Sequence, residues 1–144
     1  MPNTTAEKII HSIEAIHRTG LRFDEVSNNK IVVTMPLAGN DNHNGIMYAG
    51  SLFSLAECAA GVLFMNRFDS AVIAPICANV NIRFRRPANS DVRLSLSISD
   101  DEFSNLEAEV LEKGKASINF EENLIDSHGD VVSIADVKYV LMKI

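Results

Sequence analysis

The stretch Asn42-His-Asn-Gly-Ile-Met-Tyr-Ala-Gly-Ser-Leu-Phe-Ser-Leu-Ala-Glu57 decides the fold, because it leads from a polar loop directly into an apolar segment. The segment predicts a helix that begins near Ala49 or Gly50 and runs to about Asn66. A helix that is apolar nearly all round is a buried helix. Small residues keep its middle thin, so that a sheet can wrap it closely: Ala56, Ala59, Ala60 and Gly61.

The segments on either side of this helix predict strands. Apolar and polar residues alternate strictly over residues 78–85, as they do in a half-buried strand. The other predicted strands cover residues 21–26, 30–37, 92–98, 115–125 and 131–142. Between the first two, Asn28 and Asn29 favour a left-handed turn. One central helix with long antiparallel strands after it predicts an α+β fold.

Two further helices are predicted outside the sheet. The first covers about residues 5–19, with Thr4 or Thr5 as its cap. Isoleucines recur along it at helical spacing: Ile9, Ile10, Ile13 and Ile16. The second is polar, begins at Asp100 and is ended by Gly114. Its predicted apolar stripe is Leu106, Val110 and Leu111.

Composition limits the class of protein. A chain of 144 residues with no repeat or linker predicts a single domain over residues 1–144. A formal net charge of -6 argues against a general nucleic-acid binder, which usually carries a basic surplus. The two cysteines, Cys58 and Cys77, lie in apolar runs and are expected to be free thiols in a reducing compartment.

The sequence also bears on localisation and on metals. The N-terminus lacks a basic segment followed by an apolar one, so no signal peptide is predicted and the cytoplasm is expected. The apolar run over residues 52–65 contains Glu57 and is too short for a membrane span. The spacing of the histidines does not suggest a metal site, so neither a metal nor a cofactor is expected: His11, His17, His43 and His128.

Glu57 is the first candidate for chemistry. It is the only charged residue between Ser51 and Met65, and a carboxylate in such surroundings is costly unless it is paired or reaches water. Ser51, Ser54 and Glu57 recur at every third position and predict a narrow polar stripe. Glu57 therefore either pairs with an arginine or reaches solvent as a structural residue, or is a perturbed carboxylate available for acid–base or nucleophilic catalysis.

The start of the helix is the second candidate. At Ala49 and Gly50 the backbone N–H groups have no partner within the helix and point along the helix dipole. Such donors suit a carbonyl oxygen that gains negative charge during acyl transfer. The alternative is a tight loop-to-helix turn in which Gly50 supplies only conformational freedom.

The segments Asn42-His-Asn-Gly45 and Tyr48-Ala-Gly-Ser-Leu-Phe-Ser-Leu-Ala-Glu57 resemble the motif of the hot-dog-fold thioesterases of the 4-hydroxybenzoyl-CoA and phenylacetate-pathway type. Asn79-Val-Asn-Ile-Arg-Phe-Arg-Arg-Pro-Ala88 resembles a strand of the same family, and the resemblance extends over residues 21–144. It looks closest to the thioesterase-like domain that follows some GNAT acetyltransferases. The resemblance implies a hot-dog fold, in which an antiparallel sheet wraps a long central helix.

The resemblance also implies roles for single residues. Glu57 matches the nucleophile or general base, and the N–H of Ala49, next to Gly50, matches the donor that polarises the thioester carbonyl. Asn42 matches a polar residue that helps to hold the carbonyl or the attacking water. Tyr48 stands where the family usually has His, and Ala49 where it has Gly. In this family the site forms between two protomers.

Substrate-binding residues are predicted around this motif. Tyr48 and Ser54 are expected to contact the substrate, and Arg85 and Arg86 to contact CoA phosphates, which the planar guanidinium suits. The alternative for the arginines is a solvated strand face. Because a hot-dog protomer leaves a long sheet edge exposed, a homodimer or a dimer of dimers is expected.

The leading functional hypothesis is hydrolysis of an acyl-CoA or acyl-carrier thioester, with CoA as part of the substrate rather than as a cofactor. A dehydratase of hydroxyacyl thioesters would pair His43 with Glu57, but Glu57 lies seven residues beyond Gly50, which misses the dehydratase spacing by two. The third hypothesis is a module that binds or senses acyl-CoA without catalysis.

Overall fold

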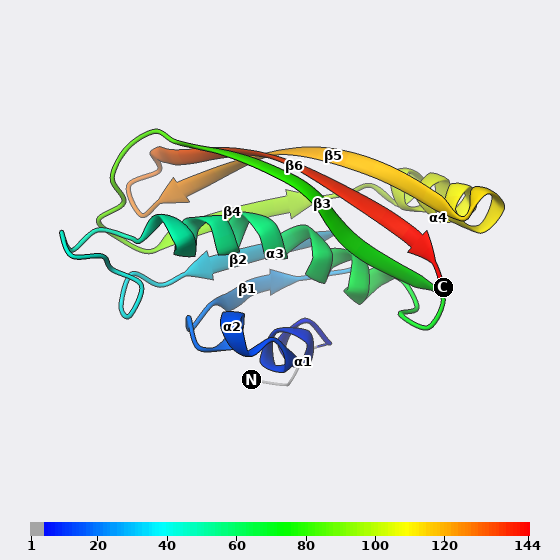
Figure 1. The fold of residues 1–144 in the computed structure, drawn as a ribbon, viewed down its shortest axis with the longest axis horizontal. Helices are drawn as coiled ribbons and strands as arrows, with labels where there is room; N and C mark the ends of the chain where they lie inside the picture. Colours follow the sequence, from blue (N-terminus) through cyan, green and yellow to red (C-terminus); the bar gives the residue numbers. More distant parts are fainter. Residues whose placement is uncertain (1–4) are drawn as a thin grey trace.

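A six-stranded antiparallel sheet curves around one long helix in this computed structural model, which describes residues 5–144 (Figure 1). The strands are β1 (Arg22–Val26), β2 (Lys30–Met35), β3 (Ile73–Phe84), β4 (Val92–Ser97), β5 (Lys115–Asp126) and β6 (Val131–Lys143). Their order across the sheet is β1-β2-β4-β5-β6-β3. The helices are α1 (Thr5–Ser12), α2 (Glu14–His17), α3 (Ala49–Arg67) and α4 (Asp100–Lys113). The predicted α+β class and hot-dog arrangement are confirmed.

The central helix α3 is thin where the sheet crosses it, as predicted. Ala56 and Ala60 are completely buried. A methyl group added at Gly61 would come within 3.0 Å of the Tyr139 hydroxyl oxygen on β6. That hydroxyl donates a hydrogen bond to the backbone carbonyl of Glu57. Within residues 5–144, α3 alone has the length and hydropathy of a membrane span, and 56% of that window is buried, as in a core helix.

Helix α4 is an insertion between β4 and β5 that packs on the C-terminal end of α3. Its Phe103 ring meets the Phe64 and Phe68 rings edge to face, with centroids 6.2 and 5.5 Å apart. The predicted stripe is wrong in one position, because Phe103 is buried and Leu111 is 46% exposed. Successive helical residues are about 100° apart, so Leu111 cannot share the face of Val110.

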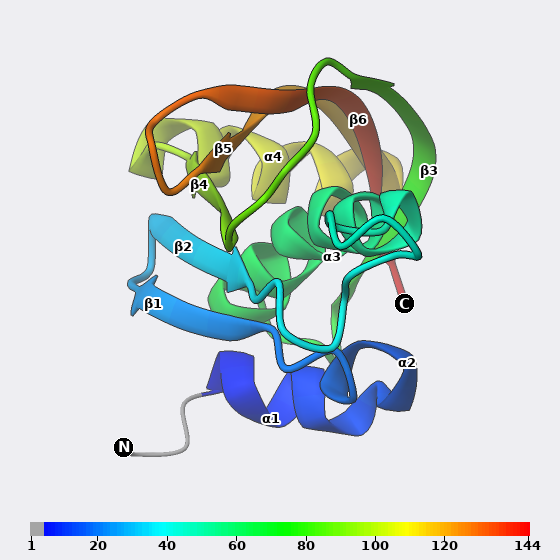
Figure 2. The ribbon, with the colours of Figure 1, turned by 90° about the vertical axis from the view of Figure 1, so that its left-hand side faces the viewer.

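The N-terminal helix is not continuous. The helix predicted over about residues 5–19 is divided into α1 and α2, because Ile13 has an extended backbone with φ -105° and ψ 91°. The proposed cap Thr4 lies outside the described residues. Helix α1 packs against α3 and β1, on the side of α3 that the sheet leaves open (Figure 2).

The turn between β1 and β2 also differs from the prediction. Positive φ angles in residues 5–144 occur only at glycines, so Asn28 and Asn29 are not left-handed. The Ser27 hydroxyl closes the turn instead by accepting hydrogen bonds from the N–H groups of Asn29 and Lys30. Asn29 donates its amide to the Ile98 carbonyl and to Asp100, which ties the turn to the start of α4.

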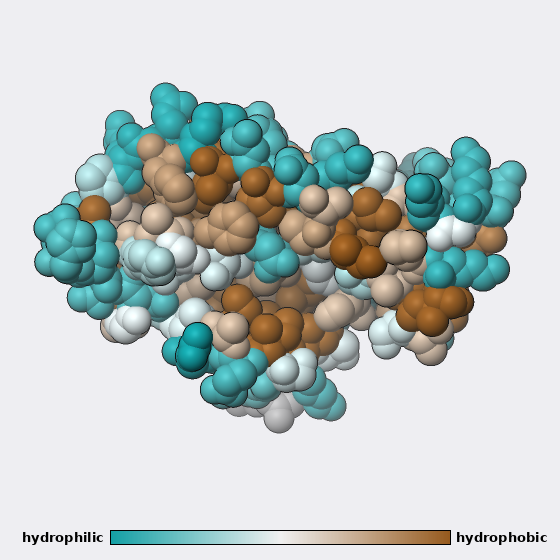
Figure 3. All heavy atoms as spheres, in the orientation of Figure 1, coloured by the Kyte–Doolittle hydropathy of each residue, from teal (hydrophilic) through white to brown (hydrophobic). Residues whose placement is uncertain are grey.

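The two edges of the sheet are unequal. Edge strand β1 has five residues, whereas edge strand β3 has twelve and begins five residues before the predicted start. Ile76 and Phe84 of β3 are 46% and 51% exposed, and Phe53 of the adjoining α3 is 41% exposed. Figure 3 shows apolar side chains gathered along β3 and around the open side of α3. This face combines an unpaired strand edge with exposed apolar residues.

Candidate active site

Glu57 lies in the middle of α3 and lines a cavity of about 210 Å³. Within residues 5–144 its carboxylate has neither a hydrogen-bond nor an ion-pair partner, so the predicted alternative of pairing with an arginine does not occur. Partial burial raises the pKa of Glu57 above its ordinary value. An unpaired carboxylate that is partly removed from water is a stronger base than an exposed one.

The serines do not form the predicted stripe with Glu57. Ser51 is buried and donates a hydrogen bond to Asn40 Oδ1 at 3.0 Å, whereas Ser54 is half-buried and donates to the Gly50 carbonyl at 2.9 Å. A spacing of three residues turns about 60° per step around a helix, so Ser51 lies about 120° from Glu57. The open side of α3 follows a spacing of four instead: Ala49, Phe53, Glu57, Gly61 and Met65.

A second groove, of about 330 Å³, lies at the N-terminal end of α3. It brings together four predicted site residues from the loop, the helix start and the end of β3: Asn42, Ala49, Arg85 and Arg86. Neither Ala49 nor Gly50 has an acceptor for its backbone N–H among the residues that the structure describes. The start of the helix therefore presents free donors, as the sequence predicted.

Asn42 has one half of its side chain available in this groove. Its Oδ1 accepts a hydrogen bond from the N–H of Asn44 at 2.8 Å and a longer one from Ile46 at 3.4 Å, which holds the loop in shape. Its Nδ2 has no acceptor in the described part of the chain. Asn42 can therefore donate to a substrate carbonyl or a water, but its oxygen is already used.

Tyr48 precedes the helix and is 58% exposed. Its ring lies directly against Gly50, and any side chain at position 50 would overlap the ring. Gly50 therefore permits this close approach, and a larger residue would make the exposed ring move away. The ring lies beside the free N–H groups, where it can contact a ligand that docks there.

The three arginines at the end of β3 differ in their partners. Arg83 pairs with Asp136 at 3.1 Å, and Arg86 pairs with Asp130 at 3.3 Å. Arg85 has no acidic partner among residues 5–144, and its exposed guanidinium borders the groove. Arg85 is therefore the cation that remains available to an anionic ligand.

Within one protomer the predicted site residues form two separate groups. Glu57 lines one cavity, and Ala49 with Asn42 lines the other. Ala49 and Glu57 lie on the same side of α3, and eight residues of helix separate them by about 12 Å. A single thioester carbonyl cannot contact both groups of one chain, because hydrogen bonds span only about 3 Å.

Sequence reasoning missed Glu122 of β5. Glu122 is 1% exposed, and neither carboxyl oxygen has a partner among the described residues. The Ser133 hydroxyl, the diagonal neighbour of Glu122 on β6, is equally buried and unpartnered. Burial first, and then the negative charge of Glu57, raise the pKa of Glu122 to about 8. The signal was present, since Glu122 occupies an inward position in an alternating run of apolar residues: Ala116, Ile118, Phe120 and Leu124.

The other titratable groups around Glu57 remain neutral. Burial, and then the Glu57 carboxylate, raise the pKa values of Cys58, Cys77 and Tyr139. Both cysteines are free thiols. The neutral forms of these three groups are therefore favoured beside Glu57.

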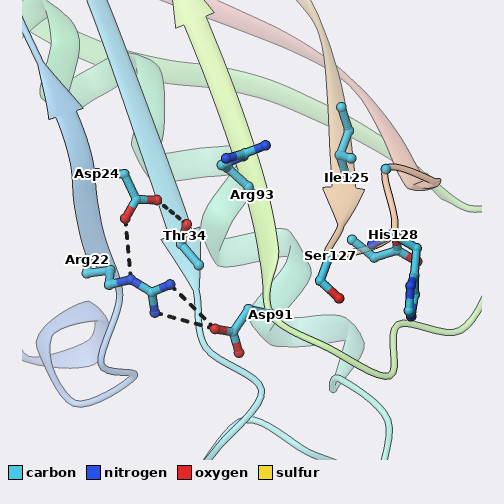
Figure 4. Close-up of a pocket in the computed structure, with 10 residues that line it drawn as sticks. Arg22, Asp24, Thr34, Asp91, Arg93, Ile125, Ser127 and His128 are labelled. Carbon is cyan, nitrogen blue, oxygen red and sulfur yellow. Dashed lines mark hydrogen bonds and ion pairs between the residues drawn. The ribbon is translucent and has the colours of Figure 1, made fainter.

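A further cleft, of about 580 Å³, lies on the outer face of the sheet (Figure 4). Some of its polar groups are joined to one another, since Arg22 contacts both Asp24 and Asp91, and Thr34 donates to Asp24. None of the predicted site residues lines it. The predicted site residues lie instead along α3, in the loop before it and at the end of β3.

The chain matches a family described as a domain of unknown function, DUF4442, over residues 16–141. Its structure is similar to that of a Pseudomonas aeruginosa protein of unknown function described as a probable thioesterase. The two are 39% identical with a TM-score of 0.91, over 100% of this chain and 97% of the other.

Two more distant structures share the fold. A protein of unknown function from Chlorobaculum tepidum is 18% identical, with a TM-score of 0.83 over 96% of this chain and 93% of the other. A thioesterase from Haemophilus influenzae is 12% identical, with a TM-score of 0.70 over 96% of this chain and 90% of the other.

Glu122 should make the protein less stable as the pH rises from about 4.5 to about 8. In the unfolded chain the carboxyl ionises near its ordinary pKa of 4.5, whereas the native protein keeps the proton until about pH 8. Between these values the native state binds more protons, so the free energy of unfolding falls with rising pH, by on the order of a few kcal/mol. Thermal melts at pH 5 and pH 8.5 should show a smaller loss of Tm for Glu122→Gln than for the wild type.

The matched control is Glu121→Gln, which removes an exposed carboxylate from the opposite face of the same strand. It should keep the pH dependence of the wild type. Equal pH dependence in Glu122→Gln and in the wild type would show that Glu122 is not buried as a neutral acid.

Proposed function

Because the chain belongs to the DUF4442 family of the hot-dog thioesterase-like superfamily, we propose that it hydrolyses acyl-CoA-type thioesters at a site shared between two protomers. The observation that carries the proposal is the unpaired, partly buried Glu57 carboxylate on the open side of an otherwise apolar helix. The relative from Pseudomonas aeruginosa, described as a probable thioesterase, supports the same reaction class.

The proposed chemistry uses the two groups of α3 in different ways. The N–H groups of Ala49 and Gly50 donate to the thioester carbonyl oxygen and stabilise the negative charge that develops on it. Glu57 either attacks the carbonyl carbon, which gives an acyl-enzyme anhydride that water then cleaves, or removes a proton from the attacking water. In both routes the C–S bond breaks, the thiolate leaves and takes up a proton, and the free acid is released.

Two protomers are needed because of the 12 Å or so that separate Ala49 and Glu57 along one helix. In a dimer related by a two-fold axis, the free N–H groups of one chain can face the Glu57 of the other. The long unpaired edge of β3, with the exposed Ile76 and Phe84, offers a surface for such pairing. We assign the homodimer to this edge.

The CoA portion is proposed to extend along the groove at the end of β3. Arg85, which has no acidic partner among the described residues, would contact its phosphates. Arg86 is a weaker candidate than the sequence suggested, because Asp130 already holds it. The free thiols Cys58 and Cys77 fit a reducing cytoplasm as the place of action.

A second candidate function is binding or sensing of acyl-CoA without turnover. The observation that favours it is Tyr48, whose ring lies against Gly50 at the start of α3. If the ring stays there when a ligand binds, it limits the approach of a thioester to the N–H donors. Turnover measurements separate this candidate from hydrolysis.

Glu57→Gln should abolish most hydrolysis while it preserves the fold. The amide keeps the size of the side chain but can neither attack nor accept a proton, so the rate should fall by about 100-fold or more. Release of the CoA thiol from a panel of acyl-CoA esters measures the rate, and a thermal melt checks the fold. Wild-type rates in the variant would make Glu57 a structural residue, and a wild type that binds acyl-CoA without turnover would favour the sensor.

The shared site can be tested by mixing two inactive variants. Ala49→Pro deletes only the N–H donor, because proline is favoured at the first helical position and Tyr48, at ψ 135°, already has the backbone that precedes a proline. A heterodimer of Ala49→Pro and Glu57→Gln contains one intact site. Co-refolded variants should therefore recover about a quarter of wild-type activity, since half of the dimers are mixed and each has one of two sites. No recovery in a mixture that sediments as a dimer would place both groups in one chain's site.

Arg85→Ala should raise the KM for acyl-CoA by about tenfold, which is the loss of affinity expected when one hydrogen bond to a charged group is removed. It should change kcat little. The KM for a short pantetheine thioester, which lacks the distal phosphates, should stay the same. Arg83→Ala is the control, because Arg83 lies on the same strand and is paired with Asp136. Equal effects of the two variants, or equal effects on both substrates, would assign Arg85 to the support of the sheet.

A further inference from the structure

The cavity beside Glu57 is closed on one side by the N-terminal segment. Ile9 of α1 and Ile13, which separates α1 from α2, line it together with Val62 and Met65 of α3. Pro75 of β3 also lines it. The cavity is thus bounded by three parts of the chain that are distant in sequence, with the candidate catalytic carboxylate between them.

The lining is chemically selective. Apart from the Glu57 carboxylate, its polar groups are the thiols of Cys58 and Cys77 and the Tyr139 hydroxyl, and no cation is among the described residues that line it. The Tyr139 hydroxyl is already used as a donor to the Glu57 carbonyl. An apolar group can therefore fill the cavity, whereas a second carboxylate would meet the charge of Glu57 with no cation to offset it.

The volume of this cavity limits the size of the apolar group that it can hold. The cavity holds about 210 Å³, and an apolar cavity of roughly 150 Å³ is known to hold a benzene molecule. A straight or cyclic hydrocarbon group of moderate length therefore fits, but a long one does not fit unless the wall moves.

We propose that this cavity binds the acyl group of the thioester, that it accepts neutral apolar acyl groups, and that Ile9 and Ile13 set their length. The proposal rests on the thioesterase function proposed above and names its substrate class. An acyl group in this cavity has its carbonyl next to Glu57, as hydrolysis requires.

The N-terminal segment determines the length because its side chains are the replaceable part of the wall. Val62 lies in the core helix and is 2% exposed, so its side chain cannot change without a cost to the core. Ile13 is 39% exposed and lies between α1 and α2, where its N–H donates to the Ile10 carbonyl and its carbonyl accepts from the His17 N–H; a side-chain substitution leaves these backbone hydrogen bonds in place. A change at Ile13 therefore alters the cavity with little effect on folding.

The test compares two opposite changes at position 13. For each protein, kcat/KM is measured with acyl-CoA esters from butyryl-CoA to dodecanoyl-CoA. Ile13→Ala should raise the ratio of decanoyl-CoA to hexanoyl-CoA by about tenfold or more, because each further buried methylene is worth roughly fourfold. Ile13→Phe should lower the same ratio, which keeps the test informative if one variant folds poorly. In the wild type, hexanoyl-CoA should be preferred to adipoyl-CoA, which has a terminal carboxylate.

Ile10→Ala is the matched control on the same helix. Ile10 is 2% exposed and borders a different groove, with Leu21 and Phe23. The variant should lower the Tm but leave the chain-length ratio of the wild type. A shift of the ratio in Ile10→Ala as large as that in Ile13→Ala would overturn the proposal, because general loosening would then explain both.

Binding separates a failure of this proposal from a failure of the proposed function. Calorimetric titration of the Glu57→Gln variant with the same esters, with and without Ile13→Ala, measures the cavity without turnover. Chain-length-dependent affinity that shifts at Ile13 supports the cavity even if the wild type hydrolyses nothing. Hydrolysis with an unchanged chain-length profile in both Ile13 variants would overturn the proposal that this cavity binds the acyl group. The proposed thioesterase function would still hold.

Discussion

The architecture depends on how closely the sheet can approach α3. At Gly61 a methyl group would lie 3.0 Å from the Tyr139 hydroxyl oxygen, which is tighter than ordinary van der Waals contact, so the tyrosine would have to shift. The same hydroxyl bonds to the Glu57 carbonyl, so the sheet is fixed to the helix backbone at the position of the candidate catalytic residue. A larger residue at the crossing would push against the Tyr139 side chain and disturb this contact.

Close wrapping also determines where charge can lie. The sheet covers one side of α3 and leaves the other, with Glu57, partly open. Glu122 lies on the covered side and is fully buried. Two carboxyl groups that share a region of low dielectric do not both ionise easily, and the more exposed one loses its proton first. Burial therefore favours the neutral form of Glu122 over that of the more exposed Glu57.

The sequence predicted the elements whose periodicity is strong and misjudged details that depend on contacts. The bounds of α3 and of α4 agree with the prediction, because an apolar run and a capped, glycine-ended segment are local signals. The break at Ile13 is not visible in the sequence, since helical spacing of isoleucines continues through it. Ser51 turned inward because Asn40 accepts its hydrogen bond, and no spacing rule includes a loop residue eleven positions away.

For the site, the sequence predicted which residues gather at the start of α3 but could not separate the arginines. Arg83, Arg85 and Arg86 are equivalent in composition, and only the register of β3 against β6 and the following turn gives two of them acidic partners. The unpaired one, Arg85, borders the groove that also contains Ala49. With the carbonyl at Ala49 and the acyl group beside the Glu57 of a second chain, the proposed substrate crosses the interface. In that arrangement the exposed edge of β3 serves catalysis, because pairing it is what brings the two halves of the site together.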